Sequence, residues 1–438
     1  MKKTPIIVLL AFATLCFSAF TFKNETKPSL KEKLSELSKK VEPKVIEWRH
    51  HIHENPELSN REYKTAEYIT AHLKSLGIEV EEGVAKTGVI GILKGGKPGP
   101  VIGLRADMDG LPVKERVNLP WASKAIGEFN GQEVPVMHAC GHDTHVAILM
   151  GVAEVLSQVK SEIKGTIKFV FQPAEEGAPD GEEGGAELMV KEGVVKNMDV
   201  IFGLHINAQT EVGKVKYRSA GIMAAVNSFE IKIKGKQAHG SAPWQGIDPI
   251  VTAAQIINNA QTIVSRSLPL TTQAAVLSFG KIEGGVRSNI IPEEVTLVGT
   301  IRTLDAGMRS RLFERFQTIV KNTAESNEAE AILTIDKGYP ITYNNPELTT
   351  MMGPTFIDVL GAANVDSNIN AITGAEDFSF FQEEIPGLYF FIGGAPSGVD
   401  YEKQASHHTP DFYVDDAGMI AGIQLLSRMV VDYADLKK

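Results

Sequence analysis

The chain has 438 residues, of which 43% are hydrophobic and 22% are charged, as in an ordinary soluble globular protein. This length exceeds what one compact core usually holds, so two domains are expected. The formal net charge of -10 argues against nucleic acid as the main partner, because binding phosphates requires a basic face. Beyond the N-terminal segment, no run is long and apolar enough to form a stable membrane span.

The first 22 residues have the pattern of a secretory signal peptide. A positively charged head, Met1 to Lys3, precedes an apolar stretch from Pro5 to Phe20, with small residues near its end. An uncleaved membrane anchor is the alternative that the length of the segment leaves open, and Phe17 is a poor residue three places before a cut after Ala19. We expect export to the periplasm or the medium, with residues 1–22 acting as the signal peptide.

The two cysteines have different expected fates. Cys16 lies in the predicted signal, so the mature chain would keep Cys140 alone. A single cysteine forms no internal disulfide, and an idle thiol is a liability in an oxidising compartment. We therefore expect Cys140 to bind a metal.

Helices and short apolar strands alternate along most of the chain. The first helix is expected around Leu30 to Val41, where apolar residues have helical spacing. A second helix is expected to start near Ser59 or Asn60, either of which can cap it, and to end at Gly77. A third is expected from Asp143 to about Val159. Strands are predicted at 89–93, 101–104, 167–171, 200–204 and 388–392. This alternation predicts an α/β fold, with a mostly parallel sheet flanked by helices.

The pattern changes between residues 219 and 334. Alternating strands are predicted at 229–233, 275–279, 295–301 and 331–335, and helices at 248–266 and 306–323. The order βαββαβ predicts a small α+β domain inserted into the larger one. The larger, catalytic domain would then comprise residues 29–218 and 335–438.

Metal-binding residue types gather in the segment HACGHDTH, residues 138–145. Cys140 and His142 are good ligands for zinc and related metals, and Gly141 between them permits the bend that they need to converge. Asp143 is suited either to cap the following helix or to hydrogen-bond a metal-binding imidazole.

Two further polar groups follow predicted strands. Glu175 and Glu176 come after the strand that ends at Phe171, and His205 closes the strand 200–204. Buried adjacent carboxylates are costly unless positive charge neutralises them, although a solvated loop is the simpler reading of the pair alone. Because ligands gather at the carboxyl ends of strands in open α/β sheets, these residues are expected to converge with Cys140.

At this point the sequence resembles the aminoacylase and glutamate-carboxypeptidase superfamily of two-metal peptidases. More narrowly, it is similar to the branch of hippurate hydrolases, N-acyl amino acid amidohydrolases and plant auxin-conjugate hydrolases. The resemblance covers nearly the whole mature chain. It is carried by HENPELS (53–59), RADMDGLP (105–112), HACGHDTH (138–145), FQPAEEG (171–177), GLH (203–205), HGSAPWQGIDP (239–249), SNIIP (288–292), EDF (376–378) and SHHTPDF (406–412).

The resemblance implies a role for each matching position. Glu175 matches the general base, Asp109 a carboxylate that orients ligands, and Asp107 a position that holds a liganding histidine elsewhere in the superfamily. His407 competes with His408 for the last ligand position, and the His-x-Pro spacing favours His408. The implied metal ligands are Cys140, His142, Glu176, His205 and His408.

Two divalent cations are implied as cofactors, with zinc or manganese first and cobalt or nickel as alternatives. Five protein ligands are too few for two separate closed tetrahedral sites, so a shared ligand and a bridging water, the expected nucleophile, complete the site. Glu175 would take the proton of that water. The inserted domain would act as a lid or a homodimer contact.

Three residues of the insert are implied to meet the substrate. His239 matches a lid histidine that stabilises the oxyanion in relatives, with a plain surface turn as the alternative. Asn289 and Arg302 are expected to meet the substrate carboxylate. The expected reaction is hydrolysis of an amide next to a free carboxylate, in an N-acyl amino acid or small peptide. A dipeptidase or aminopeptidase of the same superfamily, or an inactive metal-binding relative, is the alternative.

Overall fold

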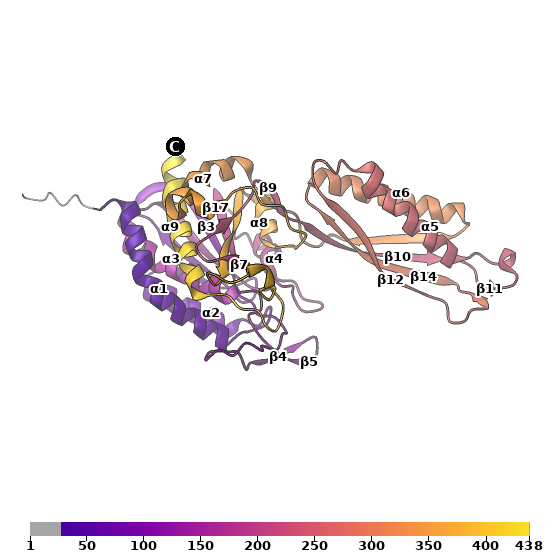
Figure 1. Cartoon of the computed structure of the whole chain (residues 1–438), viewed down its shortest axis with the longest axis horizontal. Coiled ribbons are helices and arrows are strands. Elements are labelled where there is room, and N and C mark those ends of the chain that lie inside the picture. The colour runs from indigo at the N-terminus through magenta and orange to yellow at the C-terminus, as the bar shows by residue number, and fades with distance from the viewer. Residues whose placement is uncertain (1–27, 438) are drawn as a thin grey trace, which may run out of the picture.

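The computed structural model describes residues 28–437, so the signal peptide predicted at residues 1–22 lies outside the described part. Figure 1 shows a broad body of sheet and helices, and an elongated lobe that projects from it and contains α5, α6, β10, β12 and β14. No helix within residues 28–437 has both the length and the apolarity of a membrane span.

The body is built on an eight-stranded sheet in the order β1-β2-β6-β3-β7-β18-β8-β17. Its four central strands, β6, β3, β7 and β18, are parallel, while β1, β2 and the pair β18–β8 add antiparallel contacts. The bounds are β1 Glu79–Val84, β2 Gly88–Lys94, β3 Lys97–Asp107, β6 Lys164–Gln172, β7 Val200–Glu211, β8 Val215–Lys216, β17 Val365–Asp366 and β18 Gly387–Ala395. The predicted α/β class with a mostly parallel sheet is confirmed.

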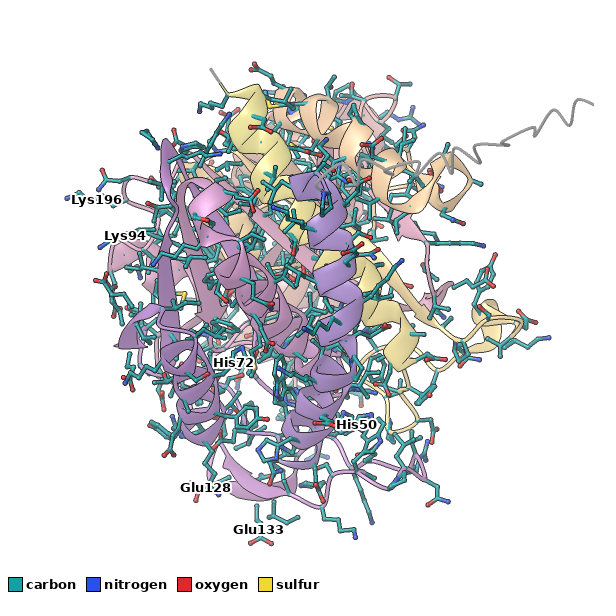
Figure 2. All side chains as sticks on the ribbon, turned by 90° about the vertical axis from the view of Figure 1, so that its left-hand side faces the viewer. His50, His72, Lys94, Glu128, Glu133 and Lys196 are labelled. Atoms are coloured by element: carbon teal, nitrogen blue, oxygen red, sulfur yellow. The ribbon has the colours of Figure 1, made fainter. Side chains whose placement is uncertain are left out.

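Helices cover both faces because the strands are apolar on both sides. In β18, Leu388, Phe390 and Ile392 join the core under one layer, and Tyr389 and Phe391 join the core under the other. Figure 2 views the first layer, where α1 and α9 lie side by side. This layer comprises α1 (Leu30–Glu54), α3 (His142–Gln158), α7 (Pro346–Leu360) and α9 (Met419–Leu436), and the other comprises α4 (Gly185–Lys191) and α8 (Phe378–Glu384).

The predicted start of the second helix is wrong. Helix α2 spans Tyr63–Ser75, and neither Ser59 nor Asn60 caps it. The Ser59 hydroxyl instead donates to Asp109 Oδ2 at 2.7 Å, and the Asn60 amide donates to the Glu183 carbonyl at 3.0 Å. Partners remote in sequence thus take both capping side chains.

The projecting lobe is a four-stranded antiparallel sheet in the order β12-β14-β10-β15, with α5 and α6 packed on it. Its bounds are β10 Ala225–Lys234, α5 Pro249–Thr262, β12 Ala275–Gly284, β14 Glu294–Thr303, α6 Ala306–Ser326 and β15 Glu330–Asp336. Short pairs complete the described strands: β4 (Ile126–Phe129) with β5 (Gln132–Pro135), β9 (Ala220–Met223) with β16 (Thr342–Asn344), and β11 (Ala238–His239) with β13 (Ile290–Ile291).

Candidate active site and metal centre

The structure brings the five predicted metal ligands together beside the parallel strands. Cys140 Sγ lies 3.4 Å from His205 Nε2 and 3.2 Å from His408 Nε2. Glu176 Oε1 lies 3.1 Å from His408 Nε2 and 3.9 Å from His142 Nε2. Strand β7, the loop after β6, the start of α3 and a loop near residue 408 supply these side chains, so the convergence depends on the sheet order.

The imidazoles are oriented as metal ligands usually are. His142 Nδ1 lies 2.9 Å from the Asp109 carbonyl, whereas its Nε2 is buried without a hydrogen-bond partner. His205 Nδ1 donates to the Ile206 carbonyl at 2.6 Å, which leaves the Nε2 lone pair facing Cys140. A ring fixed through one nitrogen, with the other free toward a shared point, fits a bound cation.

The charges also fit cations. Burial raises the pKa of the Cys140 thiol well above its ordinary value, and Glu176 and Glu175 raise it further. Burial and the neighbouring Glu376 and Glu176 likewise raise the pKa of Glu175 well above its ordinary value. Ionising these groups together requires positive charge, which divalent cations between the side chains would provide.

Three residues around the cluster have positive φ, which strains any residue other than glycine. Gly141 has φ +97, and a Cβ there would lie 2.6 Å from Ile206 Cγ2, so only glycine fits between Cys140 and His142. Ala174 and His408 also have positive φ, +53 and +64, although neither is glycine. Such strain persists only where surrounding contacts hold it, and it is concentrated at functional sites.

Asp109 fixes the backbone of both glutamates in the QPAEEG segment. Its Oδ1 accepts the Glu175 N–H at 3.1 Å, and its Oδ2 accepts the Glu176 N–H at 3.0 Å. It also contacts His142 Nδ1 at 3.2 Å. One buried carboxylate therefore positions two predicted metal ligands and the predicted base.

Asp107 Oδ2 lies 3.8 Å from His142 Nε2, and both Asp107 and Asp143 also accept from further side chains. Asp107 accepts from Arg105 and from His145 Nδ1, both at 2.5 Å. Asp143 accepts from Arg49 Nε at 2.8 Å and from His53 Nδ1 at 2.9 Å.

The two roles offered for Asp143 are therefore wrong. Helix α3 begins at His142 with Gly141 at its N-cap and no side-chain cap, and no predicted metal ligand contacts the Asp143 carboxylate. The buried guanidinium of Arg49 is a stronger partner for this carboxylate than a helix end.

His407 and His408 differ in what their ring nitrogens do. His407 Nδ1 lies 3.1 Å from the Cys140 carbonyl, and its Nε2 accepts the Ala208 N–H at 3.2 Å. Burial lowers the pKa of His407 to about 4, so the ring is neutral with both nitrogens engaged. This geometry favours His408 as the ligand, as predicted.

A cavity of about 320 Å³ opens directly onto the cluster. Besides the predicted ligands, its wall includes the largely apolar side chains of Met223, Tyr339, Ile372 and Phe391. Its size and lining suit the binding of a small molecule. These wall residues were missed from the sequence, because apolar side chains that line a pocket have the same pattern as core residues.

None of the three predicted substrate-binding residues of the lobe lines this cavity. His239 on β11 and Asn289 beside β13 are neighbours, because Gly240 N donates to the Asn289 carbonyl at 2.8 Å. Figure 1 shows β11 at the outer end of the lobe. Arg302 lies near the other end of β14, paired with Val226. The structure thus brings His239 and Asn289 to each other but not to the metal ligands.

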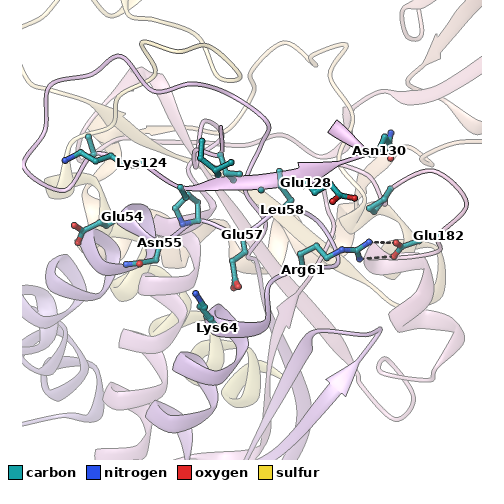
Figure 3. Close-up of a pocket in the computed structure, with 18 of the residues that line it drawn as sticks. Glu54, Asn55, Glu57, Leu58, Arg61, Lys64, Lys124, Glu128, Asn130 and Glu182 are labelled. Carbon is teal, nitrogen blue, oxygen red and sulfur yellow. Dashed lines mark hydrogen bonds and ion pairs between the residues drawn. The ribbon is translucent and has the colours of Figure 1, made fainter. Parts of the chain in front are cut away.

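A larger cavity, of about 1170 Å³, lies elsewhere on the body, between residues 54–64 and the hairpin β4–β5 (Figure 3). Arg61 and Glu182 pair across its wall, with Nη2 and Oε1 2.5 Å apart. It contains none of the predicted ligands or catalytic residues, so size alone does not identify the active site.

Glu62, which directly precedes helix α2 in the segment 54–64, was not predicted from the sequence. Glu62 is fully buried; its Oε1 accepts the Ala174 N–H at 2.9 Å and its Oε2 accepts the Thr87 hydroxyl at 2.6 Å. Burial, and then Asp109, raise the pKa of Glu62 to about 8. Glu62 thus holds the strained residue that precedes Glu175. A glutamate just before a helix gives no such signal in the sequence.

We expect Glu62→Ala to lower turnover and metal affinity by about 10-fold or more, the usual scale for residues that position metal ligands. The reason is that the buried Ala174 N–H loses its partner. In the Ala174→Gly background the loss should be smaller, because glycine adopts positive φ freely. Kinetics and metal titration of the wild type, the two single variants and the double variant measure the coupling between Glu62 and Ala174. Equal losses in both backgrounds would contradict a role through Ala174.

The sheet and the cluster of thiol, imidazole and carboxylate groups beside its strands define the class of metal-dependent hydrolases. The profile of the peptidase family M20/M25/M40 matches residues 103–432. The chain therefore belongs to this family, and it is a hydrolase that acts on carbon–nitrogen amide bonds.

Individual relatives match over most of both chains, and one solved structure shares the fold. The chain is 41% identical to thermostable carboxypeptidase 2 of Saccharolobus solfataricus, over 90% of this chain and 97% of the relative. It is 37% identical to N-acetyl-L-cysteine deacetylase of Bacillus subtilis, over 91% and 89%. A crystal structure of a dinuclear metal-binding M20 peptidase from Bacillus subtilis matches with a TM-score of 0.76 and 32% identity, covering 91% of this chain and 99% of that one.

Proposed function

We propose that the protein hydrolyses the amide bond of N-acyl amino acids or of small peptides with a free carboxylate. The observation that carries the proposal is the convergence of Cys140, His142, Glu176, His205 and His408 beside a small, largely apolar cavity. A carboxypeptidase and an N-acetyl amino acid deacetylase among the relatives support an amide next to a carboxylate.

Glu175 is the proposed general base. It lies in the wall of the cavity, with Oε2 3.8 Å from His142 Nε2. Its raised pKa suits a group that takes a proton and then returns it to the leaving amine. Tyr339 donates its hydroxyl to the Glu175 carbonyl at 2.7 Å and holds that residue in place. When bound, two divalent cations would lower the pKa of the attacking water and polarise the amide.

His239 and Asn289 are proposed to reach a cavity in a second copy of the chain, or in their own chain after the lobe closes. His239 is exposed, and its Nδ1 accepts the Ser241 N–H at 3.1 Å, which leaves Nε2 available as a donor to the oxyanion. Exposed apolar side chains near it, Trp244 and Val286, are 78% and 88% accessible, which favours a contact with another protein surface.

The substrate class can be tested with hippurate and N-acetyl-methionine, each with and without a chelator. We expect hydrolysis that the chelator abolishes and that added manganese, zinc, cobalt or nickel restores. Cleavage only of dipeptides with a free amine would instead identify a dipeptidase. Full metal binding without any hydrolysis would identify an inactive relative.

Cys140→Ser is expected to lower metal content and activity together, because the hydroxyl of serine is a poorer ligand for soft metals than a thiolate. Metal analysis of the purified variant, alongside the rate of N-acetyl-methionine hydrolysis, measures both. Full metal occupancy with normal turnover would show that Cys140 is not a ligand.

We also propose that the protein is exported. The proposal rests on the charged head and apolar stretch of residues 1–22. N-terminal sequencing of the protein from its native cell is expected to begin close to residue 23. Recovery of Met1 at the N-terminus of the mature protein would contradict cleavage.

A further inference from the structure

A row of side chains runs from the metal cluster across three neighbouring strands. Strands β7, β18 and β8 are adjacent, and their register places His205 beside Phe391, and Phe391 opposite Lys216. Residues in register on neighbouring strands project from the same face of a sheet. Because strands lie about 4.8 Å apart, Lys216 starts roughly 10 Å from His205.

Two cavities follow this row. The first, of about 320 Å³, contains the metal cluster, and the second, of about 410 Å³, is lined by Lys216. Asn207, Ile372 and Phe391 line both cavities. The two cavities therefore adjoin at these three side chains, one on the side of the cluster and the other on the side of Lys216.

The end of this row is suited to an anion. Lys216 is half-buried, and no carboxylate among the described side chains lies within ion-pair distance of its ammonium group. Gln209 and Asn370 also line the second cavity and provide amide donors. Asp366 is in register with Lys216 on β17, but its Oδ1 accepts the Asn368 N–H at 3.2 Å.

We propose that Lys216 binds a carboxylate at the far end of the acyl group of the substrate. The preferred substrates would then be N-acyl amino acids with a dicarboxylic acyl group, such as glutaryl. The methylenes of the acyl group would contact Phe391 and Ile372. The Lys216 side chain would span the distance from β8 to the carboxylate at the end of the acyl group. This inference rests on the proposed amidohydrolase function. In this arrangement the acyl group lies along the sheet, between the metal cluster and Lys216.

The experiment compares N-glutaryl-methionine with N-(4-carbamoylbutanoyl)-methionine, which has the same shape without the charge. The wild-type protein should prefer the glutaryl substrate about 10-fold or more in kcat/KM, as expected for a charge-assisted hydrogen bond. Lys216→Met should reduce this preference to about 1. The matched control is Lys214→Met, which removes a nearby lysine that pairs with Glu211 and should keep the preference.

Three outcomes would overturn the inference. Equal kcat/KM for both substrates in the wild-type protein would exclude an anion site, and a preference that survives Lys216→Met would place that site elsewhere. If Lys216→Met changed the ratio of kcat/KM for N-acetyl-glutamate to kcat/KM for N-acetyl-glutamine, Lys216 would contact the amino acid side of the substrate. The orientation of the substrate would then be the reverse of the one proposed. Hydrolysis of N-acetyl-methionine separates these results from failure of the proposed function, because that substrate needs no contact with Lys216.

Discussion

Replacing Glu175 with Gln is expected to lower turnover by roughly 10²-fold or more, the usual effect of losing a general base, while the metal stays bound. The amide keeps the shape of the side chain but cannot accept the proton. The Glu175 N–H bond to Asp109 belongs to the backbone, so the substitution should leave the loop in place. Steady-state kinetics and metal analysis of the same sample measure the two effects separately.

The adjacent residue provides the matched control. Glu176→Gln should lose metal as well as activity, because Glu176 Oε1 faces both His408 and His142. If Glu176→Gln kept its metal and Glu175→Gln lost it, the two roles would be interchanged. A Glu175→Gln protein with full turnover would remove this residue from the mechanism.

His239→Ala is expected to lower kcat by on the order of 10²- to 10³-fold, the usual cost of losing an oxyanion donor. The metal content should not change, because β11 lies at the outer end of the lobe, away from the metal ligands (Figure 1). The loss should appear in kcat more than in KM, since the contact forms in the transition state. Unchanged turnover would leave His239 as a residue of the surface turn.

Mixing two inactive variants identifies the chain that donates His239. Subunits of His239→Ala and Glu175→Gln, co-expressed or exchanged, should recover up to about a quarter of wild-type activity if donation crosses a dimer. Half of such dimers are hybrids, and each hybrid has one site with both side chains intact. No recovery, despite hybrid dimers visible by tag pull-down, would place the donation within one chain.

The sequence by itself determined the α/β class, the order of the elements and the residue types of the metal site. Strand and helix periodicities are local, so they can be read from windows of a few residues. The five predicted ligands could be named because they lie in short motifs that match those of the family, two of them after predicted strands. The bend at Gly141 was also expected, and its φ of +97 confirms it.

The tertiary structure alone decided which groups meet across long stretches of the chain. Ser59 looked like a helix cap, but its hydroxyl binds Asp109. Glu62 had no signal, but it holds Ala174 next to the predicted base. Lys216 joins the row from His205 only through the order and register of three strands. The physical reason is common to all three: a hydrogen bond or a strand pairing between distant residues is set by packing, which local sequence patterns do not encode.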